Sequence, residues 1–123
     1  MGKFTFKKEE RLSKDKLIQE LFEKGSSFYL YPFKVIFMKH PDPAFPVHQI
    51  LISVSKRNFK RAVDRNTVKR RIREAYRLNK NQLGGQNKFL IAYLYTVKEI
   101  LPSSQIHQRL VKTFKRFDYV EKN

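Results

Sequence analysis

The chain has 123 residues, and its 27 Lys and Arg against 11 Asp and Glu give a net charge of +16. Hydrophobic residues make up 41%, with 11 Phe and 6 Tyr, which favours a single folded domain over a disordered basic tail. The absence of Cys excludes a disulfide framework and a thiolate metal site, and no apolar run is long enough for a membrane span or a signal peptide. We therefore expect a cytoplasmic protein, and its excess of positive charge is typical of a nucleic-acid binder.

The N-terminal residues predict a tail followed by a helix. Residues 1–10 are polar and basic, and we expect them to form a flexible tail. Ser13 is a suitable capping residue for a helix that Gly25 would end in the left-handed conformation. The apolar side of this helix consists of Leu17, Ile18, Leu21 and Phe22.

Residues 28–39 have the alternating pattern of a strand. One face of it would carry Tyr29, Tyr31, Phe33, Val35 and Phe37. Because Pro32 cannot donate to a ladder of hydrogen bonds, the segment is either an edge strand or two strands broken at Pro32. Residues 40–48 hold three prolines and predict a loop, and residues 49–55, apolar on both faces at first, predict a central strand.

The second half alternates between helix and strand. We expect a helix over about residues 61–80, a break at residues 83–86 and a buried strand over residues 88–96. Pro102 marks the start of a final helix, whose apolar side consists of Ile106, Leu110, Phe114 and Phe117. The whole order predicts an α+β fold, an α-β sandwich with helices laid over one small sheet.

The helix over residues 61–80 is unusually basic. At 100° per residue its core-facing stripe consists of Val68, Ile72, Ala75 and Tyr76. Beside that stripe lie Asn66, Lys69, Arg70, Arg73 and Arg77. Only Asp64 and Glu74 interrupt the run, so ion pairs within the helix cannot neutralise it. A solvated charged face is the alternative interpretation, but the predominance of Arg suits bidentate contacts with phosphate and favours nucleic acid.

Two stretches in this region resemble a known family. "ISVSKR" at residues 52–57 and "AVDRNTVKRRIREAYR" at residues 62–77 are similar to the protein subunit of bacterial ribonuclease P. The similarity extends in order from about residue 11 to about residue 117. It implies a fold like the second domain of ribosomal protein S5, in the order αβββαβα, with a left-handed βαβ crossover.

The resemblance also implies a function. In this family a catalytic RNA, which coordinates Mg²⁺, cleaves precursor tRNA endonucleolytically and releases the 5′ leader, so this chain would be an accessory subunit with no catalytic or metal-binding residue of its own. No membrane and no further protein partner is implied. The implied contacts with the catalytic RNA are Arg61, Arg65, Asn66, Lys69, Arg70, Arg71 and Arg73. The leader would lie in a cleft between the first helix and the sheet, at Phe22, Phe33, Phe37, Lys56, Arg57 and Tyr93.

The sequence departs from the family pattern in four places. Thr67 stands where the motif usually has a second Arg, so that contact is lost or comes from Arg61 or Arg71. Leu51 replaces a usual Gly, Ile18 replaces a usual aromatic residue, and the loop 57–62 lacks a usual Gly. Independently of the family, aromatic residues at a spacing of two are also the ordinary pattern of a core strand.

Other functions have less support in the residues. A stand-alone nuclease would need clustered carboxylates or a pair of His, but the three His are scattered at positions 40, 48 and 107, and we expect each at the surface. A DNA reader would need helix-turn-helix spacing, which is not evident. A ribosomal-protein-like RNA-binding or RNA-chaperone module would explain the charge, and it stays open as the second hypothesis.

Overall fold

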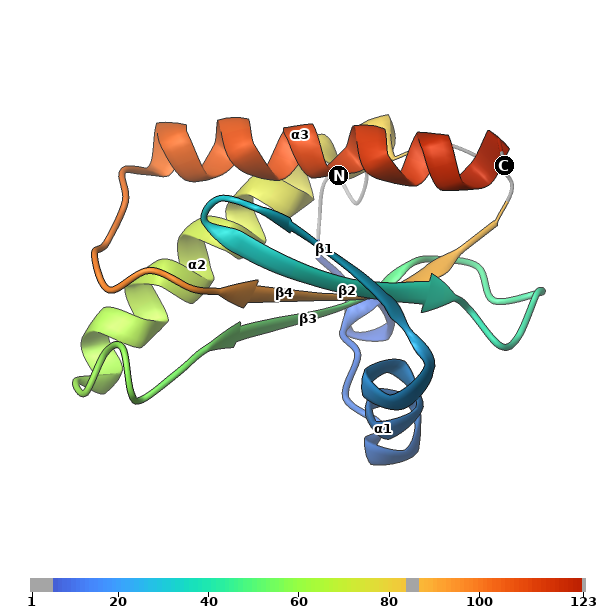
Figure 1. Ribbon diagram of the computed structural model, residues 1–123, viewed down its shortest axis with the longest axis horizontal. Helices are drawn as coiled ribbons and strands as arrows, with labels where there is room; N and C mark the ends of the chain where they lie inside the picture. Colours follow the sequence, from blue (N-terminus) through green and yellow to red (C-terminus); the bar gives the residue numbers. More distant parts are fainter. Residues whose placement is uncertain (1–5, 84–86, 123) are drawn as a thin grey trace.

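The computed structural model describes residues 6–83 and 87–122, and it has the predicted α-β sandwich (Figure 1). The sheet lies between α2 and α3 on one face, called here the helix side, and α1 on the other, called the α1 side. The observed order of helices and strands confirms the expected αβββαβα. The elements are a 3-10 helix at Lys8–Glu10, α1 (Asp15–Lys24), β1 (Ser26–Leu30), β2 (Phe33–Lys39), β3 (Gln49–Val54), α2 (Ala62–Asn79), a 3-10 turn at Lys80–Gln82, β4 (Phe89–Tyr95) and α3 (Ser103–Lys122).

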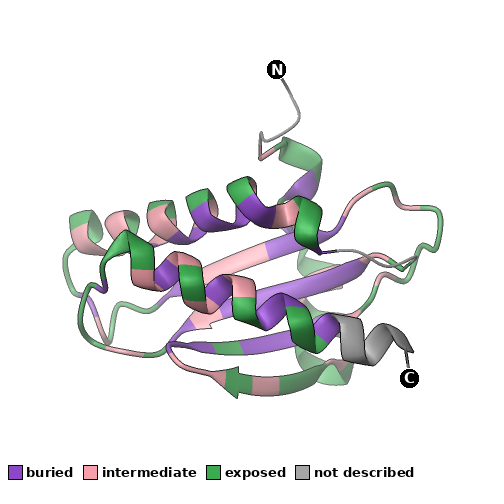
Figure 2. Cartoon of the chain, turned by 90° about the horizontal axis from the view of Figure 1, so that it is seen from above, coloured by how far each residue is buried: buried purple, intermediate pink, exposed green. Residues whose placement is uncertain are grey.

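The sheet is mixed, with the strand order β1-β2-β4-β3. β2 pairs antiparallel with β1 and β4, whereas β3 pairs parallel with β4, so α2 is the crossover between parallel neighbours. Seen from the helix side with β3 and β4 pointing up, β4 lies to the left of β3 (Figure 1 and Figure 2), which makes the crossover left-handed. This is the hand that the family resemblance implies, and the reverse of the usual one.

β3 is an edge strand, so the prediction of a central strand was wrong. Its outer edge is partly covered by the chain that precedes α1, where the Leu12 N–H donates to the Ile50 carbonyl at 2.9 Å. α1 packs on one face of the sheet and α2 on the other, which explains why β3 is apolar on both faces.

The hairpin of β1 and β2 breaks at Pro32, which confirms the two-strand interpretation. Phe28 pairs with Val35 and Tyr29 with Lys34, and partners in register share a face. Phe28 therefore lies on the helix side with Val35, and Tyr29 lies on the α1 side with 57% of its surface exposed. The expectation that Tyr29 shares a face with the aromatic residues of β2 was wrong.

The ends of α1 also differ from the prediction. Its N-cap is Lys14 instead of Ser13, and no side chain caps the first turn. Gly25 follows the helix in the extended conformation, with φ of −70°, instead of the left-handed one. Gly25 is needed for space, because a Cβ at this position would lie 2.5 Å from the Leu21 carbonyl oxygen.

The N-terminal segment packs against the body of the protein from Phe6 onward, where the sequence predicted a flexible tail. The Phe6 ring meets the Tyr76 ring edge-on, with centroids 5.9 Å apart. The Glu10 carboxylate, 2% exposed, accepts hydrogen bonds from the Lys80 ammonium at 2.8 and 3.0 Å and from the Lys7 N–H at 2.9 Å. This buried ion pair ties the segment before α1 to the end of α2.

We predict that Glu10→Ala lowers the free energy of unfolding by about 3 kcal/mol, because it removes one member of a buried ion pair. Urea unfolding measures the loss. Glu9→Ala is the matched control, since it makes the same change in charge on an exposed neighbour and should change stability by less than about 0.5 kcal/mol. Equal effects of the two substitutions would show that the Glu10–Lys80 pair does not stabilise the fold.

Candidate nucleic-acid interface

The apolar stripe of α2 is buried against the sheet and α3, as predicted. Val68, Ile72, Ala75 and Tyr76 are each at most 1% exposed and belong to the core of the helix side. This packing fixes the rotation of α2 about its axis. The side chains at either edge of the stripe are therefore held in defined positions. Residues on the opposite side of α2 are exposed (Figure 2).

Apart from Arg77, the cations of α2 have no carboxylate partner among the described residues. Arg61, Asn66 and Arg70 are exposed, and Lys69 and Arg73 are half-buried. Within residues 6–83 and 87–117, the ion pairs are Lys24–Glu20, Arg77–Glu74 and Lys80–Glu10. None of these involves a cation for which the sequence predicts contact with the catalytic RNA. The positive charge of this surface is therefore available to an external anion.

Two of the predicted contacts also have structural roles. The Arg65 guanidinium donates to the carbonyls of Phe59 and Lys60 at 2.8 and 3.0 Å, which fixes the loop before α2. The Arg71 guanidinium donates to the Leu101 carbonyl at 2.8 Å, which ties α2 to the loop between β4 and α3. Thr67, which replaces the motif's usual Arg, donates to the Val63 carbonyl within the helix at 2.9 Å.

The folded chain adds one cation that we did not assign to the site from the sequence. Arg11, Lys69 and Arg73 line the same small hollow, about 260 Å³, beside the edge strand β3. Arg11 lies 58 positions before Lys69 in the chain, so no periodic pattern could reveal the pair, and only the docking of the N-terminal segment on β3 brings them together.

Lys56 and Arg57 are exposed in the loop between β3 and α2. Phe59 anchors this loop to the core: it is 6% exposed, and its ring lies against the Tyr95 ring with centroids 6.1 Å apart. Since the loop leads directly into α2, its two cations lie at the same end of the molecule as the first turn of α2 (Figure 1).

Three residues that we assigned to the leader cleft are core residues. Phe33 and Tyr93 are 0% exposed and Phe37 is 8% exposed, and all three belong to the cluster beneath α2 and α3. The Tyr93 hydroxyl is hydrogen-bonded to the Thr113 hydroxyl at 2.8 Å. Burial raises the pKa of Tyr93 and the Thr113 hydrogen bond opposes it, so the phenol is neutral. The cleft assignment of these three was wrong, and the core interpretation of the alternating pattern holds.

The α1 side, in contrast, carries exposed aromatic side chains. Phe22 on α1 is 46% exposed, as a binding residue requires, and Tyr29 on β1 is 57% exposed. Lys34, the partner of Tyr29 in register, is exposed beside it, and the Tyr29 hydroxyl lies 3.3 Å from the Thr96 hydroxyl. Tyr29 and Lys34 were missed because the cleft residues were carried over from the family resemblance, which on this stretch of the chain named Phe33 and Phe37 instead.

The three histidines do not meet. His40 bonds to Gln49 at 2.9 Å and His107 to Asn79 at 2.8 Å. His48 is only 6% exposed and accepts from the Phe89 N–H at 3.0 Å, so its expected place at the surface was wrong. In the part of the chain that the structure describes, no three His, Asp or Glu are grouped as metal ligands, and no helix is both long and apolar enough to cross a membrane.

A small mixed sheet that carries a helix with an unneutralised row of cations defines an α+β nucleic-acid-binding protein. The family model described as Ribonuclease P matches residues 6–118. The chain therefore belongs to the ribonuclease P protein family.

Curated relatives agree with this assignment. The Ribonuclease P protein component of Porphyromonas gingivalis is 42% identical over 80 residues, which are 65% of this chain and 58% of that protein. The protein of the same description from a Geobacillus species is 34% identical over 94 residues, which are 76% of this chain and 78% of the relative. The match thus spans little more than half the length of the Porphyromonas protein.

Solved structures share the fold. The ribonuclease P protein of Staphylococcus aureus superimposes with a TM-score of 0.73 at 25% identity, over 91% of this chain and 97% of the other. That of Thermotoga maritima superimposes with a TM-score of 0.71 at 27% identity, over 87% and 96% of the two chains.

Substitutions of two neighbouring residues of α2, Arg70 and Arg71, should distinguish a binding role from a structural one. We predict that Arg71→Ala lowers the free energy of unfolding by about 1.5–3 kcal/mol, because the Leu101 carbonyl loses a charged donor. Arg70→Ala removes the same charge from an exposed position and should change stability by less than about 0.5 kcal/mol. Thermal and urea unfolding of both variants measure the difference, and similar losses would contradict the separation of roles.

Proposed function

We propose that this chain is the protein subunit of ribonuclease P. It binds the catalytic RNA and the 5′ leader of precursor tRNA, and so assists the endonucleolytic 5′ maturation of tRNA. The observation that carries the proposal is the row of cations on α2, of which only Arg77 has a carboxylate partner among the described residues. Membership of the family supports the identity of the RNA.

The catalytic RNA is expected on the surface formed by α2 and the N-terminal segment. Arg61, Asn66 and Arg70 project from it, and Arg11, Lys69 and Arg73 extend it toward β3. Guanidinium groups make bidentate contacts with phosphate, and the first turn of α2 adds the positive end of the helix dipole. The Asp64 carboxylate in the same turn offsets part of this positive charge.

The 5′ leader is expected on the α1 side of the sheet. Phe22 and Tyr29 offer exposed rings there, and stacking on such rings contributes about 1–3 kcal/mol per base with little sequence preference. Lys34 lies beside Tyr29, and Lys56 and Arg57 lie in the loop after β3. This assignment keeps Phe22 and the two loop cations from the sequence-based set and replaces its buried members.

Cleavage is assigned to the RNA. We expect the RNA to hold any Mg²⁺ used in cleavage, as the resemblance to the family implies. The contribution of this chain is then to position the RNA and the leader.

Purified protein without RNA should not cleave precursor tRNA in Mg²⁺ buffer. Sustained 5′ cleavage in a sample free of RNA contamination would overturn the assignment of cleavage to the RNA.

We predict that Arg70→Ala weakens binding of the catalytic RNA of ribonuclease P. If Arg70 contacts one phosphate, the slope of log affinity against log salt concentration should fall in magnitude by about 0.9. Titrations at several salt concentrations measure it. Lys115→Ala, an exposed substitution on α3, is the control with the same change in charge.

Two outcomes would count against the proposal. If Arg70→Ala and Lys115→Ala bind with equal affinity, α2 is not the specific surface. If the unchanged protein prefers ribosomal RNA to the catalytic RNA, the ribosomal-protein-like or RNA-chaperone function replaces it.

We predict that Phe22→Ala and Tyr29→Ala each weaken binding of leader-bearing precursor tRNA to the complex of this protein with the catalytic RNA. The loss of affinity should be about fivefold or more per stacked base, while binding of mature tRNA is unchanged. Competition binding with the two substrates measures the ratio. Phe33→Leu is the control for a core position, because it should lower stability and leave the ratio intact. If Phe33→Leu changes the ratio of the two affinities and the other two substitutions do not, the leader binds on the helix side instead.

A further inference from the structure

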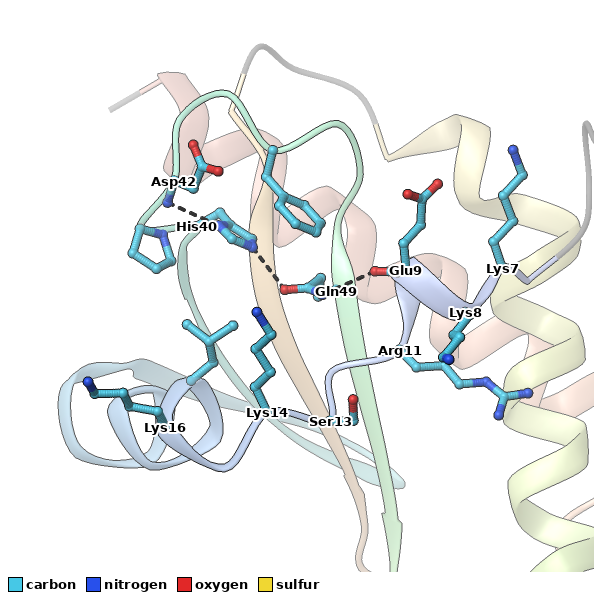
Figure 3. Close-up of a pocket in the computed structure, with 13 residues that line it drawn as sticks. Lys7, Lys8, Glu9, Arg11, Ser13, Lys14, Lys16, His40, Asp42 and Gln49 are labelled. Carbon is cyan, nitrogen blue, oxygen red and sulfur yellow. Dashed lines mark hydrogen bonds between the residues drawn. The ribbon is translucent and has the colours of Figure 1, made fainter.

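A large hollow, shown in Figure 3, lies at the start of β3. The first turn of α2 follows the other end of this strand (Figure 1). It measures about 940 Å³, is open to solvent, and is lined by residues of the segment 7–17, by residues of the loop 40–48 and by Gln49 of β3. β3 runs from Gln49 to Val54 and so places about 17 Å between this hollow and the loop that leads to α2. None of the residues assigned above to the leader lines it.

The rim of the hollow is strongly basic. Its cations are Lys7, Lys8, Arg11, Lys14 and Lys16, against the carboxylates of Glu9 and Asp42. No ion pair involves any of these five cations within the described ranges. Figure 3 shows Lys14 extending toward His40 and Gln49. Asp42 is engaged within its own loop, where its carboxylate accepts the Ala44 N–H at 2.9 Å.

The wall of the hollow is an organised aromatic surface. The His40 and Phe45 rings stack at 4.3 Å with planes 9° apart. His40 Nδ1 accepts the Asp42 N–H at 3.1 Å, so its Nε2–H donates to the Gln49 side-chain oxygen at 2.9 Å. The Gln49 amide in turn donates to the Glu9 carbonyl at 3.1 Å. This chain of hydrogen bonds fastens the loop to β3 and to the N-terminal segment.

We propose that this hollow binds an unpaired segment of RNA, as a second contact that shares Arg11 with the α2 surface. The rim cations take the phosphates, and the apolar wall of Leu17, Pro41 and Phe45 takes a base. The volume lies within the usual range of about 300–1,000 Å³ for ligand sites. An unpaired strand fits better than a duplex, because bases reach an aromatic wall only when they are free to unstack.

The inference rests on the proposed function, since the RNA is one that the α2 surface also binds. The probe is a short fluorescent single-stranded RNA of mixed sequence, compared with an RNA duplex of equal length. The double variant Lys14→Gln/Lys16→Gln should weaken binding of the single strand at least fivefold. The slope of log affinity against log salt concentration should fall in magnitude by about 1.4, because two phosphate contacts with a single strand are lost.

The matched control is Lys112→Gln/Lys115→Gln, which removes the same charge from exposed positions on α3. Phe45→Ala tests the wall and should weaken the single strand about fivefold or more while leaving the duplex unaffected. If the Lys14/Lys16 variant matches its control, or if Phe45→Ala weakens both probes equally, the inference fails.

A second experiment places the contact in the assembled complex. Because the chain has no Cys, Ala44→Cys gives a single attachment point for a hydroxyl-radical reagent beside the hollow, and Ser104→Cys gives the control at the start of α3. In the complex with catalytic RNA and precursor tRNA, cleavage directed from position 44 should fall on unpaired nucleotides. Cleavage confined to paired regions, or no more than from position 104, would overturn the proposal.

The two proposals fail in different ways. If Arg70→Ala weakens the catalytic RNA and the variants of the hollow change nothing, only the second contact is lost. If Arg70→Ala also changes nothing, the proposed function is lost with it.

Discussion

The basic surface depends on the packing of the apolar stripe of α2 against the core, because this packing holds the helix in place with its cations outward. Burying Val68, Ile72, Ala75 and Tyr76 contributes several kcal/mol, at about 1.5–3 kcal/mol for each large side chain. Repulsion between like charges at helical spacing, as between Lys69 and Arg73, costs only about 0.2–0.5 kcal/mol per pair. Packing therefore outweighs repulsion, and a helix that would be disfavoured in isolation is held with its cations outward.

Hydrogen bonding and charge neutralisation are different events on this helix. Arg65 and Arg71 donate to main-chain carbonyls, which satisfies their N–H groups and fixes two loops, but a carbonyl carries no net charge. Both guanidinium groups therefore still contribute to the positive field around Arg70. Only Arg77, opposite Glu74, is paired with a carboxylate on the same helix. The structural and electrostatic roles of one Arg can thus coexist.

The sequence predicted the features that depend on local periodicity and missed those that depend on long-range contact. The order of elements, the buried stripe of α2 and the break at Pro32 follow from spacing and from the chemistry of Pro. The face of Tyr29 was wrong because the turn at residues 31–32 reverses the chain and resets the alternation that the pattern assumed continuous. The edge position of β3 and the pairing of Glu10 with Lys80, 70 positions apart, depend on strand order and docking, which no local pattern encodes. The predicted break at residues 83–86 lies mostly outside the described residues.

The unequal covering of the sheet explains why exposed aromatic rings lie on the α1 side. Two helices of 18 and 20 residues close the helix side, and its aromatic residues become a dry core. The α1 side has one helix of 10 residues, about 15 Å long and about 10 Å wide. Four strands span about 14 Å between the outer two, and each runs about 17–23 Å, so α1 leaves part of that face uncovered. Tyr29 and Lys34 lie on one exposed part of this face, and the hollow beside Lys14 lies at the start of α1. Single-stranded RNA would meet aromatic rings and cations at both places.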